Sequence, residues 1–301
     1  MFTADKPVCY YSIILKEGDE MKKKLILVFC IAVVLILLSF TYYYYRMSLN
    51  VDGLALVKSG ENIYEVSILD LSTDSYIENI PHSDQALFLN KKELILFRSE
   101  TISLYSLETG AEEIIYKNDY KEVEQIAIRN NSQISFIIDE DIILYDLPSR
   151  TKRVLIKDNA FVDHTWSDDG KTLFYETREG FINAYQYDLE TETVVAEGRK
   201  PDFSSGYLAY TLNNTLIVKN ISTGEETECL KMCTDYCFSP DGSRLLITSA
   251  LSYDYFFSHI WRDGLGVKIF GYSVYAWEHS SGRMDMVIDY SRHLDAVCDW
   301  N

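Results

Sequence analysis

A strand–turn–strand pattern that recurs after residue 50 limits most strongly what this chain can fold into. Each copy is a strand with apolar and polar residues in alternation, a short polar turn and a second strand. Clear copies lie at 102–110, 142–150, 184–192 and 216–224, and related segments lie at 66–74 and 274–282. Equivalent positions from Leu71 onward are separated by 36, 40, 42, 32 and 58 residues. The mean, about 42, is the period of a four-stranded propeller blade.

A second motif falls between these hairpins. Residues 166–175 and 238–247 each begin with an aromatic residue, continue through an Asp-Gly turn and end in an apolar strand, and weaker copies lie at 89–96 and 128–136. The run from Ser239 to Gly242 reads Ser-Pro-Asp-Gly and resembles the repeat of TolB-like β-propellers, which also occurs in the propeller of dipeptidyl peptidases. The run from Ser167 to Gly170 departs from it at the Pro position.

The resemblance covers roughly residues 51–301 and implies a fold rather than an activity. The family includes scaffolds that bind partners and domains attached to enzymes. No hydrolase domain follows in this sequence, so hydrolase activity is not carried over.

The two ends of the repeat region complement each other. Residues 294–301 are typical of a first strand, whereas 54–57, 63–69 and 76–80 are three strands without a first one. Pairing them closes the ring and removes free sheet edges. We therefore expect an all-β, six-bladed β-propeller of four-stranded antiparallel blades, with blades at 292–301 plus 51–80, then about 84–116, 123–156, 161–198, 201–230 and 235–288.

One transmembrane helix is expected before the propeller. Residues 25–45 carry no charge, and 21 helical residues span about 31 Å, enough for a bilayer core. Lys22, Lys23 and Lys24 precede the span, and the tyrosines 42–45 follow it. This charge pattern predicts a single-pass protein with a cytoplasmic segment 1–24, a membrane helix 25–45 and an extracytoplasmic domain 46–301.

Alternatives remain open at this end of the chain. Met21 followed by three lysines is a plausible start, so either Met1 or Met21 begins the protein. A cleaved signal peptide is disfavoured because no small-x-small site ends the apolar run. A lipoprotein is disfavoured because bulky Phe29 precedes Cys30.

The charge composition limits the classes of partner that the chain is expected to bind. The chain has 28 Lys and Arg against 46 Asp and Glu, a net charge of −18, and residues 47–301 carry 42 acids and 22 bases. This acidic balance argues against nucleic acid as a partner. The simplest explanation is a well-solvated domain, and an acidic surface for a basic partner is the alternative.

Signatures of catalysis and of metal or cofactor binding are missing from the sequence. It has no Gly-x-Ser-x-Gly, no phosphate loop and no His-Glu-x-x-His, so we expect no cofactor, no metal and no catalytic residue. The Asp-Gly runs at 168–170 and 241–242 are interpreted as hairpin turns rather than calcium loops. Cys229, Cys233 and Cys237 are interpreted as partly buried thiols, and a disulfide across the connection is the alternative.

An aromatic insertion at about 250–271, between two strands of the sixth blade, is the main irregularity. Dense aromatics in a loop indicate either packing on the propeller or a binding platform. In a propeller, loops between second and third strands share a face with the connections between blades. The predicted binding residues at that face are Tyr253, Tyr255, Phe256, Phe257, Trp261, Arg262, Arg98, Arg178 and Arg199.

The function that these features favour is non-catalytic binding. We expect a membrane-anchored extracytoplasmic scaffold or sensor that takes a protein, peptide or glycan ligand at one propeller face. The alternative is a propeller-type enzyme, a glycan hydrolase or lyase, with its site in the central funnel. Such an enzyme needs converging acids, His or Arg, which a sequence alone does not reveal.

Overall fold

The computed structural model forms two units, residues 1–49 and residues 50–301. The structure describes residues 33–34, 54–59, 62–70, 75–98, 100–117, 123, 125–231, 233–239, 241–249, 272–278, 281–291 and 294–300. In the first unit these are Val33 and Val34, which are helical. The rest of the predicted span 25–45 lies outside the described residues, and within them we find no helix with the length and apolar character of a membrane span.

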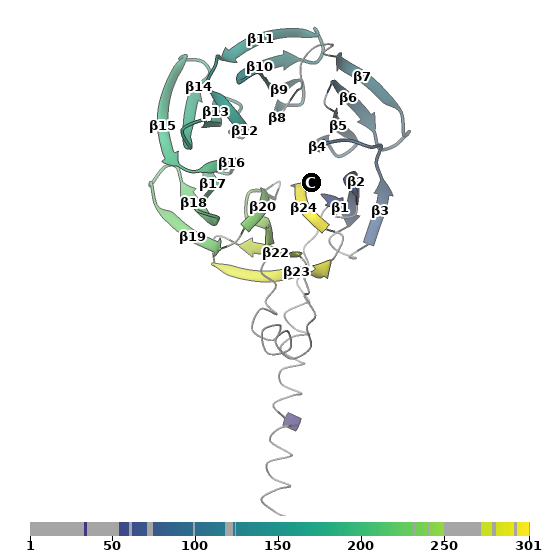
Figure 1. Ribbon diagram of the computed structural model, residues 1–301, viewed down its shortest axis with the longest axis vertical. Helices are drawn as coiled ribbons and strands as arrows, with labels where there is room; N and C mark the ends of the chain where they lie inside the picture. The colour runs from purple at the N-terminus through teal and green to yellow at the C-terminus, as the bar shows by residue number, and fades with distance from the viewer. Residues whose placement is uncertain are drawn as a thin grey trace, which may run out of the picture. The chain divides into compact units, whose positions relative to one another are not determined.

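The described strands form six four-stranded antiparallel sheets that radiate around a common centre (Figure 1). The innermost strands are β24 (Leu294–Trp300), β4 (Gln85–Asn90), β8 (Ile126–Asn130), β12 (Ala160–Trp166), β16 (Arg199–Ser204) and β20 (Cys233–Phe238). The second strands are β1 (Leu54–Ser59), β5 (Glu93–Arg98), β9 (Gln133–Ile138), β13 (Thr172–Thr177), β17 (Tyr207–Leu212) and β21 (Arg244–Ser249).

The outer half of each sheet continues in the same order. The third strands are β2 (Asn62–Asp70), β6 (Thr101–Ser106), β10 (Asp141–Asp146), β14 (Phe181–Gln186), β18 (Thr215–Asn220) and β22 (Tyr272–Glu278). The outermost are β3 (Ser75–Asn79), β7 (Glu112–Lys117), β11 (Thr151–Ile156), β15 (Thr191–Glu197), β19 (Glu226–Lys231) and β23 (Arg283–Ser291). The predicted β-propeller of four-stranded antiparallel blades is confirmed.

The two ends of the repeat region meet in one blade. Strand β24 pairs with β1, with Ala55 opposite Trp300 and Val57 opposite Val297. The sheet order is β24-β1-β2-β3, so the last strand of the chain supplies the first strand of a blade that begins near residue 54. The pairing predicted from the incomplete repeats at both ends is therefore confirmed.

The core lies between blades. One cluster joins Ile95 and Phe97 of β5 to Ile134 and Phe136 of β9, and others fill the spaces between further neighbours. Where the burial of a whole strand is described, middle strands such as β5, β9 and β10 are buried on both faces, with only their two end residues partly exposed. The outer strand β7 is mostly exposed. Long apolar runs are thus confined to the middle of each blade because neighbouring blades cover both of its faces.

Backbone hydrogen bonds separate the two faces of the propeller. On one, which we call the linker face, connections between blades bond to turns between second and third strands: Ala160 N donates to Glu140 O at 3.0 Å and Gly198 N to Gly180 O at 2.9 Å. On the other, the turn face, turns after third strands bond to turns after first strands, as in Tyr187 N to Lys171 O at 2.8 Å. The aromatic insertion follows β21, a second strand, and precedes β22, a third strand.

Candidate functional site on the linker face

Of the four predicted arginines, the three that the structure describes, Arg98, Arg178 and Arg199, are each paired with a glutamate. Arg98 ends β5, and its Nε donates to His82 O at 2.6 Å while its Nη2 donates to Glu112 Oε2 at 3.2 Å. The hydrogen bonds from the Arg98 guanidinium to the Glu112 carboxylate lower the pKa of Glu112, and they outweigh burial, which raises it. Since His82 belongs to the connection before β4, Arg98 ties a turn on the linker face to a connection between blades.

Arg178 and Arg199 each form an ion pair with a glutamate of a neighbouring blade. Arg178, in the β13–β14 turn, forms an ion pair with Glu140 in the β9–β10 turn of the neighbouring blade. Arg199, at the start of β16, has its Nε 3.7 Å from Oε1 of Glu176 on β13. Each of these three described arginines therefore faces a carboxylate, and a ligand carboxylate would have to compete with a glutamate for each of them.

A second group of charges lies beside Arg199. Asp163 precedes His164, which pairs with Tyr175, and Glu176 follows Tyr175, so the two acids lie next to this pair, where the register between β12 and β13 shifts. We call Asp163 and Glu176 the acid pair. Glu176 exposes 2% of its side chain, and Asp163 is half-buried. Burial raises the pKa of both carboxyls, and the charge of Asp163 raises the pKa of Glu176 further.

Lys200 connects the acid pair to two blades. Its backbone N donates to Glu176 Oε2 at 3.1 Å, its Nζ donates to Thr234 O at 3.0 Å, and its carbonyl accepts from the Tyr236 hydroxyl. Its φ is 54°, a left-handed conformation that is uncommon for a residue with a side chain. This conformation directs the backbone N–H toward Glu176, and a register shift in β16 accommodates it.

A buried serine–histidine pair is structural. Ser135 Oγ lies 2.7 Å from His164 Nε2 and accepts from Trp166 Nε1 at 2.8 Å. Ser135 is 0% exposed and His164 3%, so no substrate reaches the hydroxyl. The group joins β9 of one blade to β12 of the next, and it adds a polar contact to an apolar interface.

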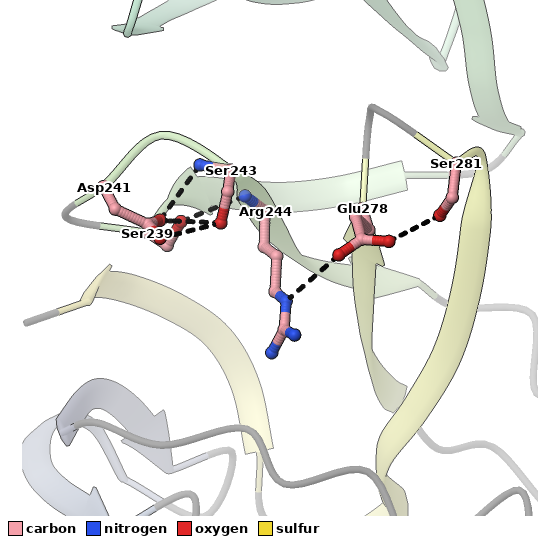
Figure 2. A network of polar contacts seen from close by, with 6 residues as sticks. All are labelled: Ser239, Asp241, Ser243, Arg244, Glu278 and Ser281. Atoms are coloured by element: carbon pink, nitrogen blue, oxygen red, sulfur yellow. Dashed lines mark hydrogen bonds and ion pairs between the residues drawn. The ribbon is translucent and has the colours of Figure 1, made fainter.

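The Ser-Pro-Asp-Gly box forms a hairpin turn on the turn face (Figure 2). Asp241 Oδ1 accepts from Ser239 Oγ at 2.6 Å and from Ser243 N at 3.0 Å, while Arg244 N donates to Ser239 Oγ at 3.0 Å. Ser167 and Asp169 repeat this arrangement, with Oγ to Oδ1 at 2.7 Å. Both aspartates use their oxygens on the turn itself, which confirms the hairpin interpretation.

The three cysteines whose side chains the structure describes are free thiols. Cys229, Cys233 and Cys237 form no disulfide, and burial raises the pKa of Cys229 and of Cys233 to about 12. Within the described strands and turns, no group of three or more His, Cys, Asp or Glu could hold a metal ion.

Part of this site is predictable from the sequence: Arg98, Arg178 and Arg199 lie on the face that their positions in the repeat indicate. The other predicted residues, Tyr253, Tyr255, Phe256, Phe257, Trp261 and Arg262, lie outside the described residues. The acid pair is not predicted from the sequence, although one signal is present: Asp163 interrupts the middle of an inner strand.

Comparisons with known proteins support the fold. No family model and no curated protein matches this sequence. A chain in the crystal structure of the nidogen/laminin complex is similar in structure, with a TM-score of 0.58 and 14% identity, over 82% of this chain and 97% of that chain. At this identity the likeness shows the fold alone.

Proposed function

We propose that this chain is a membrane-anchored extracytoplasmic propeller that binds a protein through its linker face and catalyses no reaction itself. A peptide or a glycan is the alternative ligand for this face. A similar propeller fold occurs in a complex of two proteins, nidogen and laminin, which supports protein binding as the first choice.

The observation that carries the proposal is the acid pair. Like charges at neighbouring cross-strand positions destabilise a sheet, and burial adds to that cost. The closeness of Asp163 and Glu176 therefore costs stability, which the hydrogen bond from Lys200 N to Glu176 offsets in part, and the backbone outlier at Lys200 lies beside them. Costly polar groups gathered at one face are typical of a binding site.

The aromatic insertion supports the same face. The insertion follows β21 and precedes β22, so it connects a second strand to a third strand. Arg98 and Arg178 lie at the equivalent connections of other blades. Aromatic residues and arginine are residue types that are enriched at the centres of protein interfaces.

The test is a comparison of two double variants of the full chain purified in detergent. Trp261→Ala with Phe257→Ala removes aromatic area from the insertion, and Leu189→Ala with Ile221→Ala removes exposed apolar side chains from the turn face. Partners co-purified with the wild type are identified by mass spectrometry, purified, and titrated against each variant. We expect the first variant to lose its partner at an unchanged melting temperature and the second to retain it. A first variant that melts early and still binds the same partner contradicts the proposal.

A propeller-type glycan hydrolase or lyase is the second candidate, and the acid pair is the observation that favours it. Such enzymes use two carboxyl groups on either side of a sugar bond. Glu176 exposes only 2% of its side chain, however, so a sugar ring has little access to this carboxyl group. Glycan cleavage by the wild type that is lost in Glu176→Gln would favour the enzyme over the scaffold.

A further inference from the structure

The outermost strands of the blades differ in charge. Where their side chains are described, β7, β15 and β19 carry glutamate within their first three residues, whereas β11 carries Lys152 and Arg153 there. Each of these strands ends its sheet, so one of its edges pairs with no described strand. Charged residues on such edges keep separate copies from pairing, and glutamates on every edge would repel one another. Strand β11 is instead complementary in charge to the other three.

The two cations of β11 are available to a carboxylate. Both residues are exposed, and within the described part of the chain neither side chain forms an ion pair or a hydrogen bond. Lys152 Nζ lies 5.6 Å from the centre of the Tyr116 ring, and Arg153 Cζ lies 4.7 Å from the centre of the Tyr187 ring. These contacts already restrict both long side chains, so binding a carboxylate costs them less side-chain entropy.

Exposed aliphatic side chains accompany the charges on β7 and β11. Ile114 is 55% exposed and Val154 is 49% exposed. They occupy equivalent positions, because each lies just before the residue where the register of its strand shifts. Opposite charges and aliphatic pairs at neighbouring cross-strand positions stabilise a sheet. Aligned as parallel neighbours on this equivalence, the two strands match at three successive positions: Lys152 with Glu112, Arg153 with Glu113, and Val154 with Ile114.

The glutamates of β7 have room for these donors. Glu113 pairs with Arg150 of the same chain, but the two side chains are 62% and 56% exposed, so this ion pair contributes little. Glu112 accepts from Arg98 at 3.2 Å through Oε2. An ionised carboxylate has about four acceptor sites, so each glutamate can take a further cation.

The positions of β7 and β11 allow two such contacts at once. The strands belong to neighbouring blades (Figure 1), and both run from the turn face to the linker face. A twofold axis parallel to the propeller axis therefore brings β11 of each copy against β7 of the other and keeps the facing strands parallel. An interface of this kind is closed, so it produces a dimer rather than a filament.

From this arrangement we propose that the outer wall, the exposed residues of β7 and β11, is an interface between two copies of this chain. Each copy has a net charge of −18 and repels the other at a distance, so the contact depends on the local complementarity of the two strands. The inference goes beyond the proposed function and does not depend on it, because the outer wall leaves the linker face free for a partner.

Sedimentation velocity of the full chain in a density-matched detergent measures the association. We expect the wild type to pass from monomer to dimer as its concentration rises. Arg153→Glu and Glu113→Arg should each weaken the dimer by about tenfold or more, because each places like charges at both symmetry-related contacts. Lys171→Glu makes the same charge change as Arg153→Glu at an exposed position of the turn face, and it should leave the association unchanged.

A mixture of the two charge variants tests the pairing itself. Combining the Arg153→Glu chain with the Glu113→Arg chain restores opposite charges at both contacts of a mixed dimer. We expect the mixture to associate as strongly as the wild type, although neither variant does so alone. A substitution that only disturbed the fold would not be rescued in this way.

Cross-linking measures where the copies touch. Ile114→Cys and Val154→Cys chains are mixed and treated with a short bis-maleimide, and we expect a product of twice the chain mass. Each variant alone should give only the background of the unsubstituted chain, because the twofold axis separates identical residues. A mixture of Ile114→Cys with Val194→Cys is the control, since Val194 is an exposed aliphatic residue of another outermost strand.

Three results would overturn the inference: a wild type that stays monomeric up to its highest soluble concentration, a dimer that Arg153→Glu leaves as stable as before, or a mixture of charge variants that does not recover. A dimer held by another part of the chain gives the second result. A chain that dimerises as expected but binds no partner refutes the proposed function and leaves this inference intact, and a monomer that binds its partner does the opposite.

Discussion

At the scale of the residue, Gly242 shows how one turn position also joins two blades. Its φ is 67°, and a Cβ there would lie 2.3 Å from Ser205 Oγ and 2.5 Å from Ser205 Cβ in the neighbouring blade. Ser205 Oγ donates to Asp241 O at 3.0 Å, so the two turns are already in contact. Glycine is required both for the turn conformation and for the approach of the neighbouring blade.

A pair of glycines separates these two requirements. Gly282 has the same φ of 67° with nothing within 4 Å of the added Cβ. We expect Gly282→Ala to lose about 1–2 kcal/mol of unfolding free energy from backbone strain, and Gly242→Ala to lose about 1–3 kcal/mol more from the clash. Urea denaturation of both variants measures the difference, and equal losses would show that the two blades do not pack tightly at this turn.

His164 predicts a pH dependence of stability. Burial lowers its pKa from 6.5 to about 4, so the folded state keeps the ring neutral while the unfolded state gains a proton. The unfolding free energy therefore falls as pH decreases from about 6.5 to 4, by about 3 kcal/mol in total.

The variant His164→Gln tests this, since it cannot titrate in that range. Burial raises the pKa of Asp202 to about 6, so Asp202 makes the folded state more stable as pH falls, but this contribution is common to both proteins. The difference between the wild-type and variant curves should therefore shrink toward pH 4. Parallel curves across that range would contradict the assignment of a neutral buried histidine.

At the scale of the element, β24 is the strand that closes the ring. It pairs with β1 on one side, and without it the backbone of β1 becomes an unpaired edge. We expect a chain truncated after Ser291 to aggregate or to melt far below the wild type, because opening a blade removes a large share of a total stability of about 5–15 kcal/mol. A chain ending at Trp300, which retains all of β24, is the control. An unchanged melting temperature after the larger deletion would contradict a structural role for β24.

The elements also show how far the sequence could predict the structure. Hairpin periodicity located the strands well: the predicted copy at 142–150 begins in β10 and ends just before β11, and the expected pairing of the two chain ends is observed. Such features are local or repeated, so a single sequence displays them. The acid pair is neither, because it depends on the register between β12 and β13 and on the blade that covers them.

The arginines also show which features a sequence predicts and which it does not. Their face could be predicted from topology, since turns after second strands all lie on it. Their partners Glu112, Glu140 and Glu176 could not, because Glu140 lies 38 positions before Arg178 and the other two are set by side-chain reach across strands. The face on which a charged residue lies is thus predictable from the sequence, whereas the residue that pairs with it is not.

At the scale of the whole molecule, the charge distribution predicts the orientation in a membrane. Three lysines precede the uncharged run 25–45, and only Arg46 follows it closely. Basic residues stay on the cytoplasmic side, so residues 47–301, with their excess of 20 acids, are expected outside. A linker face that binds a protein would then meet its partner outside the cytoplasm.

Two cysteine variants measure this orientation with a membrane-impermeant maleimide. Leu189 is 71% exposed on the turn face, so Leu189→Cys should be labelled in intact cells, or in spheroplasts where an outer membrane is present. Lys22→Cys should be labelled only after permeabilisation, and it is present whether the chain starts at Met1 or Met21. The unsubstituted chain, which has six cysteines of its own, sets the background, and Cys229 and Cys233 should add little to it because burial raises the pKa of each thiol to about 12 and the thiolate is the reactive form. Replacing Lys22, Lys23 and Lys24 together by Gln in the Leu189→Cys chain should reduce its labelling, since the charge difference that sets the orientation is lost. Labelling of Leu189→Cys only after permeabilisation would place the propeller in the cytoplasm and contradict the predicted orientation.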